Sequence, residues 1–292
     1  MPWIFRYVMS FYWNLARPFI CVIEQTPGDL SRIFWCPTGP FVFLPIHAAG
    51  LYGTQASEPG HKVFDFVVSS YVPTLSILAQ SPNPDPAFSR GLRLLAVRQP
   101  SSDGQPRLPG VDTELVHIRE VIRNSPSAQT TLVESSVGTV EEVLTLMKEA
   151  DWCHFACHGI QDAASPTESG LCLADMRRLK LSDIITLSRP RGGLAFLSAC
   201  QTATGDGKLS DEAIHIAAGM LFAGYGGVVG TMWSISDKLA PGVARDVYGQ
   251  LFRNGMPNYR DAARALHDAV GRLRDNSRAS FVEWLPFIHV GL

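Results

Sequence analysis

Cysteine and charge are both scarce in this sequence. Six of the 292 residues are cysteines, mostly inside apolar runs, so we expect free buried thiols in a reducing compartment rather than a disulfide framework. Charged residues make up 18% of the chain and the net charge is −2, which leaves no basic field for nucleic acid. We therefore expect a cytoplasmic protein without a nucleic-acid partner.

Uninterrupted apolar runs long enough to cross a membrane are also lacking. The aromatic N-terminal segment is interrupted by Arg6 and Arg17, so we expect a packed amphipathic helix there; a membrane anchor or signal segment is the alternative. The apolar stretch 213–233 is broken by Gly224 and Gly226, which favours a buried helix followed by a strand. No membrane partner is expected.

The sequence shows neither a fixed-period repeat nor a low-complexity tail. It has instead short apolar runs, several of them continuous, with helical patterns between the later ones, which predicts an α/β fold with a mostly parallel sheet and helices on both faces. Strands are expected at 33–37, 41–46, 64–72, 92–97, 151–157, 194–200 and 226–233, and helices at 111–124, 139–150, 210–224 and 259–276.

Local signals place helix ends and a domain boundary. Thr139 followed by Glu142 predicts a capping box, and Ser210 and Gly224 predict the start and end of another helix. Turn-forming residues concentrate at 81–88 and 98–110. We accordingly predict two lobes, residues 1–105 and residues 106–292.

The segment DWCHFACHG, residues 151–159, holds two cysteines and two histidines. On a strand, Cys153 and Cys157 face one way and His154 and His158 the other. The two histidines would lie about 13 Å apart at roughly 3.3 Å per residue, too far to share one ion. We therefore predict no metal and no cofactor, with the cysteines and His154 as packing residues.

His158 is the exception, because the predicted strand ends there and Gly159 begins a loop. Cys200 ends the next continuous apolar strand. Neighbouring parallel strands would bring an imidazole and a thiol to one edge of the sheet, where α/β folds place their ligands. A nearby histidine gives a cysteine the thiolate character of a nucleophile. An inert, buried Cys200 is the alternative.

These motifs, in this order, resemble those of a known family. The caspase signature Q-A-C-[RQG]-G, with its histidine about 50 residues upstream, is similar to SACQT and HG here. More specifically, the chain resembles the CHAT domain family, over about residues 32 to 289. The matching stretches, in family order, are FLPIHAAG, LPGVDTEL, HFACHG, ESGLCLAD, FLSACQTATGD, LSDEAIHIAAGMLFAGYGGVVGTMWSISD and AARALHDAV.

The resemblance implies a caspase-like three-layer α/β/α sandwich preceded by a degenerate caspase-like lobe. It implies a cysteine endopeptidase in which His158 is the catalytic histidine and Cys200 the nucleophile. The backbone N–H groups of Gly159 and Cys200 would form the oxyanion hole. The partner would be a protein or peptide substrate, and the context programmed cell death.

Family members often carry tetratricopeptide repeats, and none precedes the domain in this sequence. Three interpretations follow: a stand-alone protease, a fragment of a longer protein, or a protease whose regulatory partner is a separate tetratricopeptide-type protein. The alternative function is a catalytically silent scaffold module in signalling or cell-death defence. Three acidic residues are candidates for selecting the substrate. Each is explained more simply as an acid of a loop or of a helix cap. They are Asp175, Asp206 and Asp211.

Three further residues have weaker expected roles. Trp233 and Asp237 are expected at the far wall of the cleft, and His47 is expected to serve packing in the N-terminal lobe.

Overall fold

The structure is a computed structural model. The structure describes residues 9–10, 13–14, 30–52, 60–79, 91–102, 104–125, 129–135, 137–160, 162, 164–187, 193–201, 212–253, 255–276 and 279–292. Within these ranges, only the main chain is described for residues 40, 166, 199–201, 212–215 and 276.

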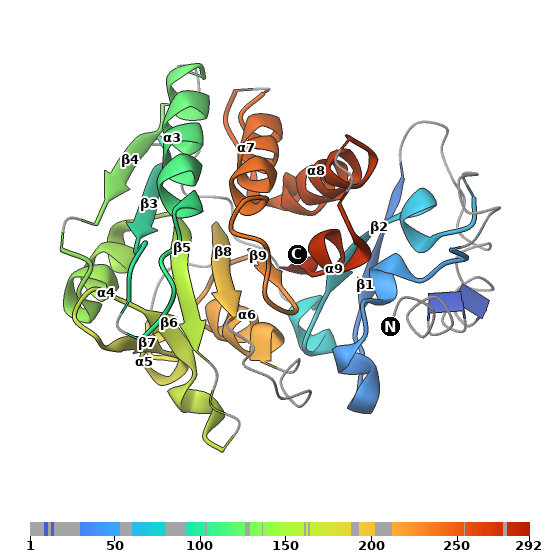
Figure 1. Cartoon of the computed structure of the whole chain (residues 1–292), viewed down its shortest axis with the longest axis horizontal. Helices are drawn as coiled ribbons and strands as arrows, with labels where there is room; N and C mark the ends of the chain where they lie inside the picture. Colours follow the sequence, from blue (N-terminus) through green and yellow to red (C-terminus); the bar gives the residue numbers. More distant parts are fainter. Residues whose placement is uncertain are drawn as a thin grey trace.

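The described strands form one sheet (Figure 1), and most of them fall where continuous apolar runs predict them. They are β1 (Ser31–Trp35), β2 (Val67–Tyr71), β3 (Arg93–Arg98), β4 (Thr131–Glu134), β5 (Trp152–Ile160), β6 (Gly170–Cys172), β7 (Arg178–Lys180), β8 (Leu194–Gln201), β9 (Gly227–Thr231) and β10 (Phe287–Gly291).

The sheet order is β1-β2-β10-β9-β8-β5-β3-β4, and β6 joins the end of β5 to β7. Neighbours along the main path are parallel except β10 and β9, which are antiparallel. The sheet therefore has two parallel blocks of opposite direction. β3 precedes the predicted boundary at 105/106 and pairs with β4 and β5, which follow it. The division into two lobes remains a prediction.

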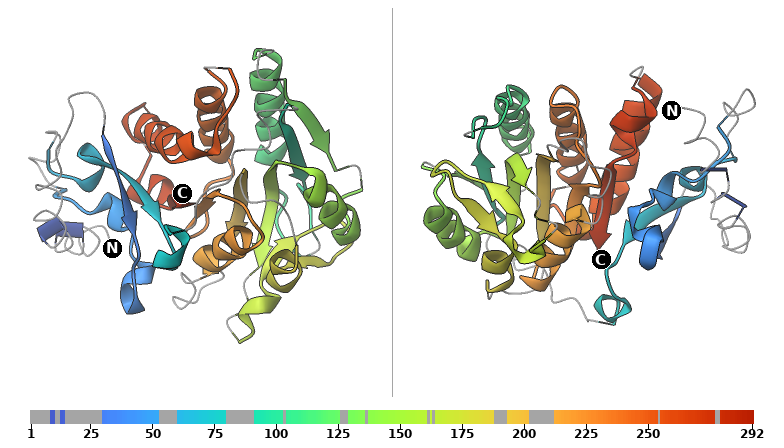
Figure 2. Two further views of the ribbon diagram at one scale, coloured as in Figure 1. Left: turned by 180° about the vertical axis from the view of Figure 1, so that it is seen from behind. Right: turned by 60° about the horizontal axis from the view of Figure 1, so that its bottom comes forward.

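Helices cover both faces of the sheet (Figure 2). α3, α7 and α8 pack on one face and α4, α5 and α6 on the other, each layer around its own hydrophobic cluster. This three-layer arrangement confirms the predicted α/β sandwich with a mostly parallel sheet. The helices are α3 (Gly110–Arg123), α4 (Val140–Glu149), α5 (Leu181–Ile185), α6 (Glu212–Phe222), α7 (Ala240–Leu251), α8 (Ala262–Asn276) and α9 (Phe281–Trp284).

The helix-end signals are confirmed in part. Thr139 Oγ1 accepts a hydrogen bond from Glu142 N at 3.3 Å. The Glu142 carboxylate accepts from Gly138 N at 2.6 Å, one residue before the N-cap of the predicted box. Gly224 has φ +109° just beyond α6, as the end of a helix favours. Ser210 lies outside the described residues.

Several elements differ from the prediction. The strands β4, β6 and β7 and the short helices α5 and α9 were not predicted. Residues 41–46 are not a strand but fall across two 3₁₀ turns, Gly39–Phe43 and Ile46–Ala48, each preceded or begun by a proline that cannot donate to a ladder. β10 was not expected, because it follows only a short helix and is a brief run near the end of the sequence.

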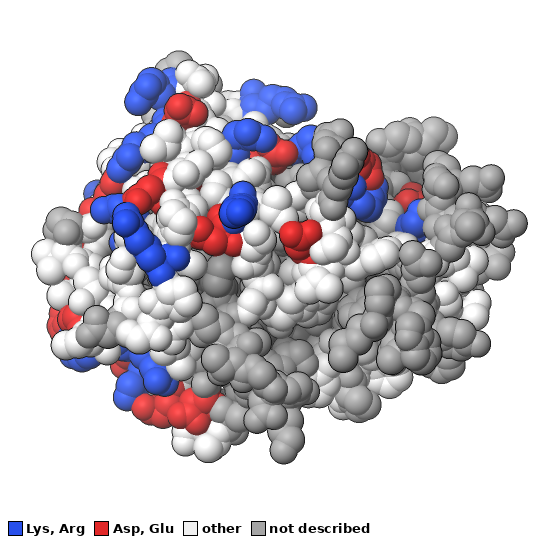
Figure 3. Space-filling view, in the orientation of Figure 1, with Lys and Arg blue, Asp and Glu red and all other residues white. Residues whose placement is uncertain are grey.

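The segment predicted to be an N-terminal amphipathic helix lies mostly outside the described residues; Met9 and Trp13, which are described, are buried. No helix among the residues that the structure describes is long and apolar enough to span a membrane. On the face seen in Figure 3, basic and acidic side chains are interspersed. Among the ion pairs of the described residues, the Arg119 guanidinium donates to both carboxylate oxygens of Glu134 at 2.7 and 2.6 Å.

Candidate functional site

β5 and β8 lie side by side at the centre of the sheet, and their register brings the predicted dyad positions together. His158 is the Cα partner of Cys200, and Gly159 that of Gln201. The strands are parallel, so both positions lie at the same end of the sheet. The main chain of Cys200 is described, whereas its side chain lies outside the described part of the structure.

His158 sits deeper than expected. Its side chain is only 1% exposed, and β5 continues through Gly159 and Ile160, which pair with Leu171 and Gly170 of β6. The prediction that the strand ends at His158 is therefore wrong. Pairing with the antiparallel strand β6 continues β5 beyond Gly159, the residue predicted to begin a loop.

The ring of His158 is held from one side. Its Nε2 lies 2.7 Å from the carbonyl oxygen of Pro106, which can only accept, so Nε2 carries the proton. In the neutral ring Nδ1 is then unprotonated and able to accept a proton. Nδ1 is buried and has no hydrogen-bond partner among the described residues. The Pro106 contact thus orients the imidazole, and Nδ1 remains able to accept a proton.

A buried polar cluster lies earlier along β5 and β8 than the His158 and Cys200 positions, on the face of the sheet that α3 and α7 cover. Glu114 of α3 is 2% exposed and accepts from the Ser198 hydroxyl at 2.9 Å. Its other oxygen lies 3.2 Å from His154 Nε2, and His154 Nδ1 lies 3.2 Å from the Tyr248 hydroxyl. One carboxylate therefore links α3 to both strands that carry the candidate dyad.

Sequence reasoning missed Glu114, although a signal was present. Val111, Glu114, Leu115 and Ile118 occupy one face of α3 and all are buried. An acid on the apolar face of a helix requires a buried partner. The Pro106 carbonyl left no comparable signal, because any residue supplies a backbone oxygen.

The two cysteines of β5, Cys153 and Cys157, are packing residues, as predicted. Cys153 and Cys157 are fully buried and belong to the α4 and α6 layer, opposite the two histidines. The Cys153 sulfur lies 2.7 Å from the Tyr225 hydroxyl. No group of three or more potential metal ligands occurs within the described ranges.

The acidic candidates for substrate selection have local explanations or are not described. Asp175 accepts from Arg177 Nε at 2.9 Å and from Val140 N at 3.3 Å, at the start of α4. Asp206 and Asp211 lie outside the described residues.

The expected cleft-wall residues serve other contacts. Asp237 accepts from Gly110 N at 2.7 Å and so satisfies a free N–H at the first turn of α3. The Trp233 indole donates to the Val282 carbonyl at 3.1 Å. His47 packs as predicted, with Nδ1 2.8 Å from the Tyr71 hydroxyl and Nε2 3.0 Å from the Leu285 carbonyl.

Comparison with known proteins gives a family and a fold. A family model described as CHAT domain matches residues 12–292. No curated protein sequence matches the chain.

Three solved structures are similar to this chain. The Arg specific cysteine proteinase gingipain R (RGPB) aligns with a TM-score of 0.59 at 10% identity, covering 97% of this chain and 66% of that chain. The complex of Porphyromonas gingivalis RgpB pro- and mature domains gives 0.56 at 9% identity, with 97% and 68% covered. The Saccharomyces cerevisiae separase–securin complex gives 0.49 at 17% identity, with 77% and 14% covered.

The chain therefore spans about two thirds of the length of the gingipain chains it matches. At these identities the gingipain alignments establish a shared fold.

Proposed function

This chain belongs to the CHAT domain family, and from that premise we propose that it is a cysteine endopeptidase that hydrolyses peptide bonds of a protein substrate. Cys200 is the nucleophile and His158 the general base and acid. The observation that carries the proposal is the register of β5 and β8, which places these two residues opposite each other.

The surroundings of His158 support its role. The Pro106 carbonyl fixes the proton on Nε2, which leaves Nδ1 to take a proton from a thiol. A buried nitrogen without a described partner is costly unless another group meets it. A thiol opposite it in register would supply that group, and the same contact would favour the thiolate.

The proposed reaction has two stages. The Cys200 sulfur forms a bond to the substrate carbonyl carbon while its proton passes to His158 Nδ1, and the charge on the carbonyl oxygen is met by the backbone N–H groups of Gly159 and Cys200. His158 then gives the proton to the departing amine as the C–N bond breaks. Water, deprotonated by His158, attacks the thioester and releases the acid and the thiol.

The remaining assignments belong to this proposal and rest on the family resemblance and the sequence. They are a cytoplasmic location, a tetratricopeptide-type regulatory partner and a role in programmed cell death. The competing function is a silent scaffold of the same fold. A scaffold has no chemical need for an imidazole oriented beside a cysteine position, and this favours the enzyme.

Electrophile labelling tests the proposal. The full chain, before and after limited proteolysis to relieve latency, is treated with a peptidyl acyloxymethyl ketone, and the modified cysteine is located by mass spectrometry. We expect the label on Cys200, its loss in Cys200→Ala and its retention in the matched control Cys157→Ala, whose thiol is buried. Labelling that survives Cys200→Ala, or no labelling in any form of the chain, would support the scaffold instead.

A peptide library with mixed sequences then reports hydrolysis. We expect cleavage products from the wild-type chain and none from Cys200→Ala. A variant that still cleaves would rule out Cys200 as the nucleophile.

A further inference from the structure

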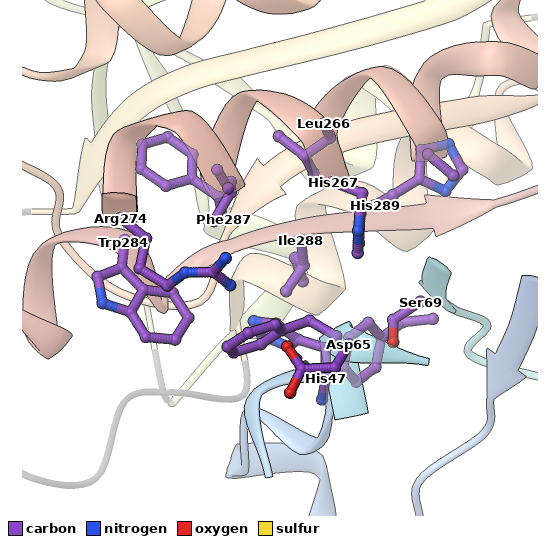
Figure 4. A pocket seen from close by; sticks show the side chains of 15 residues that line it. His47, Asp65, Ser69, Leu266, His267, Arg274, Trp284, Phe287, Ile288 and His289 are labelled. Carbon is purple, nitrogen blue, oxygen red and sulfur yellow. Dashed lines mark hydrogen bonds between the residues drawn. The ribbon is translucent and has the colours of Figure 1, made fainter. Parts of the chain in front are cut away.

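A cavity lies away from the candidate dyad, between residues of the ranges 47–71 and 263–289 (Figure 4). It has a volume of about 100 Å³, and none of the residues that line it belongs to β5 or β8. Leu266, His267 and Arg274 of α8 approach it from one side, and His47, Asp65 and Ser69 from the other.

The cationic group of the cavity is Arg274. Its guanidinium carbon lies 4.0 Å from the centre of the Phe64 ring, and Nε and Nη2 donate to Asp275 at 2.7 and 3.2 Å. The stacked, anchored head retains unused N–H groups and extends toward Asp65 and His47 in Figure 4. A fixed planar guanidinium of this kind suits a carboxylate.

The anionic group is Asp65. Its Oδ2 accepts backbone N–H groups of Gly60, His61 and Lys62 at 3.0, 3.2 and 3.1 Å, which leaves Oδ1 available. Asp65 forms no ion pair with Arg274 or with another cation in the described ranges, although both side chains line the cavity. Arg274 and Asp65 therefore face one space without pairing with each other, and Arg274 is paired instead with Asp275 on its other edge.

Two neutral polar groups complete the lining. Ser69 Oγ is buried and has no hydrogen-bond partner within the described part of the chain. His267 projects from α8 into the space, and burial lowers the pKa of its imidazole, so it faces the cavity as a neutral donor and acceptor. Unused polar groups in a partly enclosed site indicate a polar ligand.

Apolar side chains and one glycine shape the rest. Val270, Trp284 and Ile288 supply apolar surface. Gly271 also lines the cavity, and no heavy atom lies within 4 Å of the position that its Cβ would take. Glycine is a poor helix former in the middle of a helix, and here it keeps the space beside α8 open.

We propose that this cavity binds a small zwitterion of the α-amino-acid class with an apolar side chain. Arg274 receives the carboxylate, Asp65 the ammonium group, and the apolar wall the side chain. A simple anion would face the Asp65 carboxylate and a simple cation the Arg274 guanidinium. Only a molecule with both charges uses both groups.

Calorimetric titration of the full chain tests the charge requirement. The probes are L-leucine, 3-methylbutylamine, which lacks the carboxylate, and 4-methylpentanoate, which lacks the ammonium group. We expect L-leucine to bind about tenfold or more tightly than either half-ligand, because each charge-assisted contact is worth at least that ratio.

Substitutions test the location. Gly271→Leu fills the cavity and should abolish L-leucine binding, whereas the matched control Gly249→Leu, on an exposed and equally open position of α7, should retain it. Both variants replace a helical glycine by a better helix former, so both should fold, as thermal unfolding will show. Arg274→Gln should reduce L-leucine affinity to that of 3-methylbutylamine.

Three results would overturn the proposal. One is equal affinity of L-leucine and either half-ligand. Another is unchanged L-leucine binding to Gly271→Leu. The third is no heat with L-leucine or L-phenylalanine up to about 10 mM, a concentration that detects even millimolar affinity.

Discussion

At the scale of single residues, the orientation of His158 depends on one backbone oxygen. The Pro106 carbonyl, 2.7 Å from Nε2, does for this imidazole what a carboxylate does in a catalytic triad, because it fixes the tautomer and the ring plane. It lacks a negative charge, so it stabilises an imidazolium less. The proposed dyad would then depend on the position of this ring.

Replacing His158 tests that position. We expect His158→Gln to lower the rate of peptide hydrolysis by about 10²–10⁴, the contribution of a positioned general acid–base, with a parallel fall in the labelling rate of Cys200. The control His61→Gln changes a histidine outside the candidate site and should leave both rates unchanged. Equal rates for His158→Gln and wild type would remove His158 from the mechanism.

Another histidine makes the stability depend on pH. Burial lowers the pKa of His47 to about 4, whereas an unfolded chain has a histidine pKa of about 6.5. The unfolded state therefore binds more protons between these values, and His47 stabilises the fold above about pH 6.5 and loses that contribution as the pH falls toward 4. Burial lowers the pKa values of His267 and His289 in the same direction.

We expect the free energy of unfolding, measured with urea between pH 7.5 and 4.5, to fall with decreasing pH in the wild type. His47→Gln keeps an acceptor for the Tyr71 hydroxyl and a donor for the Leu285 carbonyl, and should show a shallower fall. An identical pH slope in both proteins would contradict a neutral, buried His47.

At the scale of elements, α3 is attached to the sheet by polar as well as apolar contacts. Glu114 accepts from Ser198 of β8 and contacts His154 of β5, and Asp237 holds the first N–H of the helix. The helix follows the loop that supplies the Pro106 carbonyl. Its position is therefore coupled to the position of the His158 ring.

Removing the Glu114 carboxylate leaves the buried Ser198 hydroxyl without its acceptor. We expect Glu114→Ala to lower the free energy of unfolding by about 3 kcal/mol, since an unsatisfied buried polar group costs about 1–3 kcal/mol. Glu114→Gln keeps one acceptor and should cost less. Urea unfolding measures both, with the exposed Glu120→Ala of the same helix as control; equal stability of Glu114→Ala and the control would show that the cluster contributes nothing.

The first residue of α3 is also sensitive to size. A Cβ at Gly110 would overlap the Asp237 carbonyl oxygen, whereas one at Gly242 in α7 would meet no atom within 4 Å. We expect Gly110→Ala to destabilise the fold by about 1–3 kcal/mol through overpacking. Gly242→Ala should stabilise it by up to about 1 kcal/mol. Thermal unfolding of the pair checks the sign of each change, and a stabilised Gly110→Ala would contradict the close contact.

Elements with a strong local sequence pattern could be predicted, whereas short elements and tertiary contacts could not. Continuous apolar runs identified β5 and β8, and their order along the chain was enough to place His158 and Cys200 on neighbouring strands. Short strands such as β6 were missed because three residues carry no periodic pattern. The apolar residues of the segment 41–46 predict a strand, but Pro45 within it and Pro40 before it favour the turns that form there. The Glu114 cluster and the Pro106 contact depend on tertiary packing, which no local pattern encodes.

At the scale of the whole molecule, β10 joins two parallel blocks of opposite direction. It pairs antiparallel with β9 and parallel with β2, where Val290 is the Cα partner of Tyr71. The cavity proposed to bind a zwitterion lies beside this junction, lined by residues of β2 and β10. Ligand binding there would stabilise the contact between the blocks by mass action.

A charge in β10 should separate the blocks. Val290 is fully buried, whereas Val282 is 58% exposed on α9. We expect Val290→Asp to lower the free energy of unfolding by about 4 kcal/mol or more, because a buried carboxylate would have no counter-ion, and Val282→Asp to change it by less than about 0.5 kcal/mol. Urea unfolding of the two variants makes the comparison, and similar midpoints would show that β10 is dispensable.

The position of β10 also bears on how the protein is made. Ser70 and His289, which hydrogen-bond across this junction, are 219 residues apart in the sequence. At about 5–20 residues per second, translation of that interval takes on the order of tens of seconds. Throughout it the β1–β2 pair has no strand to join it to the rest of the sheet. Completion of the described sheet must therefore follow synthesis of β10, and the edge of β2 that pairs with β10 stays open until then.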